Sequence, residues 1–132
     1  MPNPTALQVD LAAITHNLAE VRRLAGDRLV LAAVKADAYG HGIVEVARSI
    51  ETSGSADWLG VATVDEGLLL RETGITLPIL KFSPTLSDEE AAITAGLTLS
   101  VGDEPAIRRI SAAGAAAGKT ADVHLKVDTG MH

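Results

Sequence analysis

The residues best suited to chemistry lie in one nine-residue stretch, Val34 to Gly42, which reads V-K-A-D-A-Y-G-H-G. It begins where an apolar run from Leu29 ends in Lys35, and it contains the chain's one tyrosine, Tyr39. An apolar run of this kind, bounded by a loop, is typical of a strand buried on both faces. A lysine at the carboxyl end of such a strand loses solvent, which favours the neutral, nucleophilic amine. The pattern therefore predicts amine chemistry at the carboxyl edge of a sheet, where α/β folds build active sites.

The segment Gly40-His41-Gly42 predicts a turn that opens a helix at Ile43. Free amides at the start of a helix attract anions, so a phosphate could bind there. The complete dinucleotide and phosphate-loop fingerprints are absent. Buried strand, lysine, tyrosine and glycine loop together fit a carbonyl cofactor that carries a phosphate. From the residues alone, two alternatives stay open: a surface lysine that closes a strand, and a tyrosine that only packs against the loop.

Composition and charge exclude several classes of protein. The chain has 132 residues, a formal net charge of -6 and a pI near 5.1, which suits one domain and disfavours nucleic acid and anionic membranes as partners. Cysteine is absent, so disulfides and thiol catalysis are excluded, and the four histidines share no metal-ligand spacing, so we predict no metal site. No apolar run approaches the ~20 residues of a membrane helix, and the N-terminus lacks signal-peptide features. We expect a soluble, cytoplasmic protein.

Strand-like apolar runs alternate with helix-like segments along the whole chain. The expected strands are 29–35, 58–62, 78–82, 97–101 and 123–127. Asp10 is expected to cap a first helix with an apolar face, which contains Leu11, Ile14, Leu18, Val21 and Leu24. A second helix should turn Ile43, Val46, Ala47 and Ile50 inward. The segments 63–66 and 87–90 have the spacing of capping boxes, and Asp103 is expected to cap a helix with Pro105 in its first turn.

This alternation predicts an α/β fold with a parallel sheet and right-handed crossovers. Two architectures fit the pattern. One is a self-contained, doubly wound sheet of five strands. The other is the N-terminal part, about five strands, of a (β/α)8 TIM-type barrel, which typically needs ~250 residues.

The stretch V-K-A-D-A-Y-G-H-G strongly resembles the cofactor-binding signature of the alanine racemases, which are pyridoxal-phosphate enzymes of the barrel type. Further similar stretches follow in the same order: Val9-Asp10-Leu11, Leu59-Gly60-Val61-Ala62, Asp65-Glu66-Gly67, Pro78-Ile79-Leu80 and Leu125 to Met131. The resemblance covers essentially the whole chain. It implies that residues 1–132 are the N-terminal portion of the barrel domain, with the remaining strands and a C-terminal β domain outside this chain.

The resemblance also implies roles for individual residues. Lys35 would form an aldimine with pyridoxal 5'-phosphate and, once released, remove the substrate's α-proton from one face. Tyr39 would donate its phenol to the cofactor phosphate. Lys126 matches a lysine that is carbamylated in many family members, although its spacing alone favours an ion pair with Asp128. Phe82 is expected to pack behind the cofactor ring.

By the same resemblance, the function is that of an alanine racemase, an isomerase that interconverts L- and D-alanine for cell-wall precursors, as a cytoplasmic homodimer. Its second catalytic base would come from a later part of the sequence, so these residues alone are expected to be inactive. Three alternatives remain: a serine or broad-specificity amino-acid racemase, a non-catalytic pyridoxal-phosphate or phosphate-binding module, and a structural fragment that binds nothing.

Overall fold

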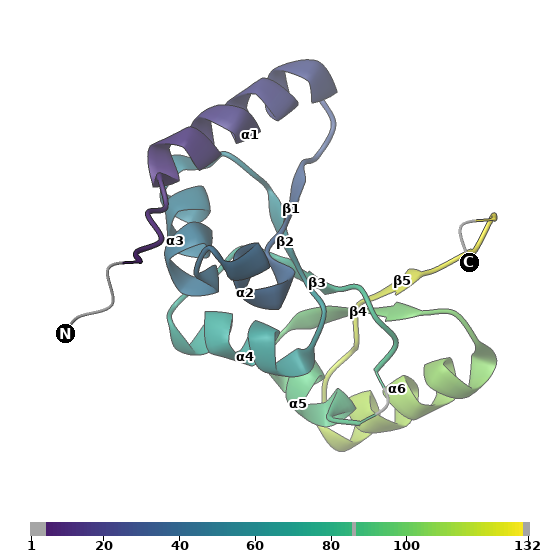
Figure 1. Ribbon diagram of the computed structural model, residues 1–132. Coiled ribbons are helices and arrows are strands. Elements are labelled where there is room, and N and C mark those ends of the chain that lie inside the picture. Colours follow the sequence, from purple (N-terminus) through teal and green to yellow (C-terminus); the bar gives the residue numbers. More distant parts are fainter. Residues whose placement is uncertain (1–4, 86, 131–132) are drawn as a thin grey trace.

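A parallel sheet of five strands is the frame of the computed structural model, which describes residues 5–85 and 87–130 (Figure 1). The strands are β1 (Leu31–Ala33), β2 (Trp58–Val61), β3 (Ile79–Lys81), β4 (Leu97–Val101) and β5 (Val123–Leu125). The helices are α1 (Leu11–Ala25), α2 (Lys35–Gly40), α3 (Ile43–Ser53), α4 (Val64–Glu72), α5 (Glu89–Thr94) and α6 (Glu104–Ala116). The predicted alternation of strands and helices is confirmed.

The order of the strands decides between the two predicted architectures. Each strand pairs in parallel with the next one in the sequence, in the order β1-β2-β3-β4-β5. A doubly wound sheet reverses its strand order at a switch point, and this sheet does not, so the doubly wound interpretation is wrong. Right-handed crossovers that advance in one direction place the helices on one face. Figure 1 shows α3, α4, α5 and α6 as such an outer layer.

The sheet is strongly curved, and its concave face is the one opposite the helices. Trp58 on β2 and His124 on β5 have ring centroids 5.7 Å apart, although β3 and β4 lie between their strands. Three strand spacings in a flat sheet would separate such residues by about 14 Å. The concave face therefore closes in the manner of a barrel wall, and the fold is that of the N-terminal part of a (β/α)8 barrel.

The hydrophobic core lies between the helices and the convex face of the sheet. Its largest fully buried side chains are Val34, Ile50, Leu59, Val61, Leu70, Ile79, Leu99 and Val101. Burial of one such side chain contributes about 1.5–3 kcal/mol. The prediction that the first strand is buried on both faces is wrong. Ala32 and Val34 are buried, whereas Ala33 is exposed and Leu29 is 73% exposed, because that side of the strand faces the open concavity.

The first two long helices differ in how well they match their predicted faces. Asp10 caps α1 as predicted, and its carboxylate accepts a hydrogen bond from the Ala13 amide at 3.0 Å. Val21 and Leu24, however, are 48% and 74% exposed, because α1 packs mainly against α3 and its C-terminal half extends beyond that helix (Figure 1). In α3 the predicted inward face is confirmed, since its four members are buried.

The two predicted capping boxes have opposite outcomes. At the start of α4 the Thr63 hydroxyl accepts from the Glu66 amide at 3.2 Å, and the Glu66 carboxylate accepts from the Thr63 amide at 3.1 Å. The second box is wrong. Helix α5 begins at Glu89, one residue later than the box requires, and its N-cap Asp88 has a left-handed backbone and makes no capping hydrogen bond. The Ser87 hydroxyl instead donates to the Asp88 carboxylate at 2.9 Å. Asp103 caps α6 as predicted.

Candidate functional site

Lys35 lies directly before a stretch of backbone whose conformation is rare for residues with side chains. The strand before it ends at Ala33, two residues earlier than predicted, and Lys35 begins the short helical turn α2. The next four residues, Ala36 to Tyr39, all have φ between +52° and +56°, which makes a left-handed turn without glycine. Each non-glycine residue in this region costs about 1–2 kcal/mol. Other contacts must therefore hold the turn in place.

Hydrogen bonds at both ends fix this turn, which we call the lysine loop (residues 34–42). The Ala38 amide donates to the Val34 carbonyl at 2.8 Å, and the Gly42 amide donates to the Asp37 carbonyl at 2.9 Å. The Asp37 carboxylate accepts from the Ile43 amide at 2.8 Å, which caps α3. At this helix start, where the sequence predicts that a phosphate could bind, the first amide is thus already bonded to a carboxylate of the chain itself.

Glu66 ties the lysine loop to the neighbouring strand. One oxygen of its carboxylate accepts from the Ala36 amide at 2.7 Å, directly after Lys35. The other accepts from the amides of Ala62 and Thr63 at 2.8 and 3.1 Å, at the end of β2. The sequence indicated only the cap of α4. The contact with Ala36 spans 30 residues and has no local signal.

The aromatic ring of Phe82 lies beside the Lys35 amine. The Nζ atom lies 5.9 Å from the centre of the Phe82 ring, within the range of a cation–π contact. The ring lies directly over Gly60 on β2, where an added Cβ would be 2.1 Å from the Phe82 Cζ atom. The structure thus places Lys35 and Phe82 together on the concave side, at the carboxyl edge of β1 and β3.

Tyr39 and Lys126 share this edge of the sheet but come from different segments. Tyr39 is on the lysine loop, with 60% of its side chain exposed. Lys126 directly follows β5, and its amide donates to the Val101 carbonyl at 2.7 Å, which extends the strand ladder. Strand alternation places it on the same face as His124, the concave one. Lys35 and Lys126 therefore follow the first and last strands of the sheet.

Lys81, which the sequence left unexplained, points away from this concave face. Its side chain is only 4% exposed, and its amine donates to the carbonyls of Ser83 and Pro84 at 2.6 and 3.1 Å. Burial lowers the pKa of the Lys81 amine, an effect that the charge of Glu89 partly opposes. Lys81 thus holds the backbone that follows Phe82.

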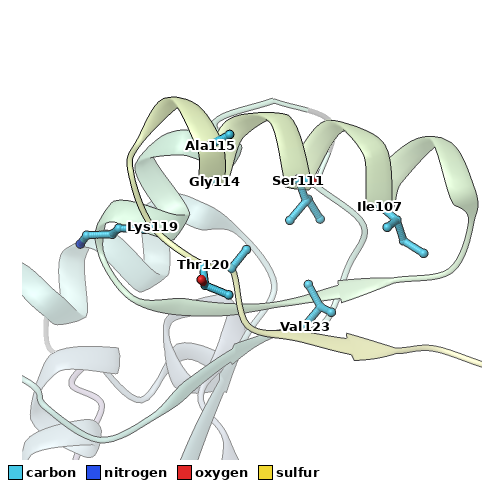
Figure 2. A pocket seen from close by; sticks show the side chains of 9 residues that line it. Ile107, Ser111, Gly114, Ala115, Lys119, Thr120 and Val123 are labelled. Atoms are coloured by element: carbon cyan, nitrogen blue, oxygen red, sulfur yellow. The ribbon is translucent and has the colours of Figure 1, made fainter.

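A separate hollow of about 390 Å³ lies between α6 and the start of β5. Figure 2 shows Ile107 and Ser111 of α6 facing Val123 across it. Lys119 at its rim donates to the Thr94 carbonyl at 2.7 Å. None of its lining residues belongs to the lysine loop, so we do not assign it to the candidate site.

Membrane-spanning helices and metal-binding clusters are both absent from residues 5–85 and 87–130. No helix in these ranges has the length and apolarity needed to cross a membrane. Within the same ranges, no three histidine, cysteine or acidic side chains gather in a way that could hold a metal ion.

The donor set at the carboxyl edge fits a carbonyl compound that carries a phosphate. A partly buried lysine amine can attack an aldehyde, an exposed phenol can donate to a phosphate, and an aromatic ring offers an apolar surface. Fold and site together define a class: a barrel-type β/α domain with a lysine on the loop after its first strand. The chain belongs to the alanine racemase family, because the model of "Alanine racemase, N-terminal domain" matches residues 9–132.

Individual relatives agree with this assignment. The chain is 56% identical to the alanine racemase of Cutibacterium acnes over 131 residues, covering 98% of this chain and 35% of that protein. It is 48% identical to the alanine racemase of Mycolicibacterium smegmatis over 124 residues, covering 93% and 32%. The solved alanine racemase from a D-cycloserine-producing Streptomyces lavendulae superposes with a TM-score of 0.86 at 40% identity, covering 92% and 32%. The chain spans about a third of the length of these relatives.

Proposed function

We propose that these residues form the cofactor-binding portion of an alanine racemase that works with pyridoxal 5'-phosphate. The observation that carries the proposal is the Lys35 amine at the carboxyl edge of a curved parallel sheet, 5.9 Å from the Phe82 ring. The names of the relatives support alanine as the substrate. Residues 1–132 are, in this proposal, the N-terminal portion of the barrel domain of a cytoplasmic homodimer.

Each side chain of the site has a role in this proposal. Lys35 binds the carbonyl carbon of the cofactor through Nζ, and its free amine later takes the α-proton of the amino acid on one face. The cofactor, when bound, supplies an electron sink for the charge left on that carbon. Tyr39 donates its phenol to the phosphate, and Phe82 excludes water beside Lys35. Carbamylation of Lys126 is a further part of the proposal.

Borohydride trapping tests the assignment of Lys35. The amine condenses with the aldehyde of pyridoxal phosphate with loss of one water, and hydride from borohydride reduces the new C=N bond to a stable secondary amine. We expect peptide mapping to find the adduct on Lys35. The variant Lys35→Ala should lose it, and the matched variant Lys119→Ala should keep it, because Lys119 lies on another face.

The same proteins separate the alternatives. A Lys35→Ala protein that loses only modest affinity for the cofactor, measured by equilibrium binding without borohydride, would identify a non-catalytic binding module. Trapping that is spread evenly over Lys119 and Lys126, with none on Lys35, would contradict the proposed site. Discrimination between alanine and serine is measured by racemisation of both amino acids in the full-length enzyme that contains these residues.

A further inference from the structure

Glu66 makes more contacts than a helix cap requires. A capping box needs one carboxylate oxygen to accept from the N-cap amide, and the second oxygen of the box residue is ordinarily free for water. In this chain the second oxygen, Oε1, accepts from the Ala36 amide at 2.7 Å. The first oxygen, Oε2, accepts hydrogen bonds from the amides of both Ala62 and Thr63. The carboxylate therefore joins two segments that lie about 30 positions apart in the sequence.

The segment on the Oε1 side is the one that carries Lys35. The Ala36 amide belongs to the peptide group whose carbonyl is that of Lys35, so its direction sets the orientation of the Lys35 backbone. Ala36 is also the first residue of the left-handed turn, with φ at +52°. An anionic acceptor gives a stronger hydrogen bond than a neutral one, and it holds this peptide group at the point where the unusual conformation begins.

We propose that Glu66 is a positioning residue for Lys35. Its carboxylate clamps the lysine loop to the end of β2 and the start of α4, so that the Lys35 amine is presented beside Phe82 in one orientation. This inference rests on the proposed function only in the use of Lys35 as the cofactor attachment point. The clamp itself follows from the three hydrogen bonds.

The variant Glu66→Gln removes the clamp with little change in shape. A glutamine has one acceptor oxygen and a donor NH2 group, so it cannot accept from Ala36 and from the Ala62 and Thr63 amides together. The variant Glu66→Asp keeps the charge at the start of α4 but is one methylene shorter, which removes its reach to Ala36. The matched control is Thr63→Ala, which breaks the cap of α4 and leaves the bond to Ala36 intact.

Trapping with pyridoxal phosphate and borohydride gives the first readout, with Lys119, which lies outside the site, as the internal reference in the same sample. We expect Glu66→Gln and Glu66→Asp to reduce the initial labelling of Lys35 about tenfold, the effect of losing one charge-assisted hydrogen bond. Labelling of Lys119 should not change. Thr63→Ala should lower the melting temperature but change Lys35 labelling by less than about twofold.

Hydrogen exchange at the Ala36 amide, followed by NMR, gives a readout without the cofactor. Both Glu66 variants should accelerate exchange at Ala36, and Thr63→Ala should leave it near the wild-type rate. Unchanged exchange in the Glu66 variants, or Lys35 labelling that falls in step with melting temperature in all three variants, would overturn the inference. Absence of a Lys35 adduct in the wild type would instead contradict the proposed function, while the exchange result would still decide on Glu66.

Discussion

At the scale of single residues, the Phe82 ring can lie where it does because Gly60 has no Cβ atom. A Cβ at position 60 would lie 2.1 Å from Cζ and 2.5 Å from Cε2 of that ring, and 2.8 Å from Leu31 Cδ2. Real side chains do not approach so closely, so any larger residue must displace the ring. Because the ring neighbours the Lys35 amine, the size of residue 60 controls the apolar side of the candidate site.

We therefore expect Gly60→Ala to destabilise the protein by about 1–3 kcal/mol, the usual result of overpacking. Urea unfolding measures this change. The same substitution in a Phe82→Leu background should cost less, because the smaller side chain leaves room for the new methyl group. Gly102→Ala is the control, since a Cβ there would meet only the Lys126 carbonyl at 3.8 Å. Equal costs at positions 60 and 102 would show that the ring does not lie where we describe it.

Lys81 leads to a prediction about pH. Burial lowers the pKa of its amine in the folded protein, whereas in the unfolded chain it is about 10.4. Between these two values the unfolded state binds more protons, so the contribution of Lys81 to stability rises with pH up to about pH 10.4 and is smaller below the folded pKa. Urea unfolding from about pH 8 to about pH 10 should show this rise in the wild type relative to Lys81→Met. Parallel pH profiles would contradict it.

The sequence was most informative about residues whose neighbours are close in the chain. The combination of Lys35, Tyr39 and the glycine loop was recognisable because it lies within nine positions. The second role of Glu66 could not be found in this way, since Ala36 is 30 residues away. Lys81 had no explanation until the burial of its side chain and its bonds to the following backbone were known.

At the scale of elements, the start of α3 depends on Asp37. Its carboxylate accepts from the Ile43 amide, and its own backbone is left-handed at φ +54°. Asp and Asn tolerate this conformation better than other residues with a Cβ. We expect Asp37→Ala to destabilise the protein by about 1 kcal/mol or more through loss of the cap, as measured by thermal unfolding. Asp37→Asn should stay close to the wild type, because it keeps an acceptor oxygen. Equal losses of thermal stability in the two variants would show that the negative charge of Asp37, rather than its acceptor oxygen, stabilises the start of α3.

Elements were predicted well where pattern and capping agree, and poorly where the backbone is unusual. The helix at 43–53 and the cap at Thr63 follow directly from apolar spacing and from a hydroxyl three residues before an acid. The segment that begins at Ser87 has the same spacing of a hydroxyl and a glutamate, yet the left-handed Asp88 interrupts the expected cap. The left-handed turn from Ala36 to Tyr39 could not be predicted, because it contains no glycine and depends on distant contacts.

At the scale of the whole molecule, one end of the sheet presents apolar side chains to solvent. Val123, Leu125 and Val127 are 46%, 68% and 70% exposed. Among the described residues, β5 pairs only with β4, so its other edge offers free backbone groups. An edge strand of this kind with apolar side chains is a template for association with another chain. Neither the exposure nor the sheet curvature can be calculated from local pattern, since both depend on how all five strands close.

We therefore expect a polypeptide made of these 132 residues alone to associate with itself in a concentration-dependent way, as sedimentation velocity would show. The variant Leu125→Lys should shift the equilibrium towards monomer, because a charge on the edge strand must lose its hydration when a second copy pairs with it. Leu24→Lys is the matched control: Leu24 is 74% exposed, similar to Leu125, but lies on α1 far along the chain from β5. If both variants reduce association equally, general surface apolarity drives it. If the wild type stays monomeric at all concentrations, the exposed edge of β5 does not drive self-association, and the prediction is wrong.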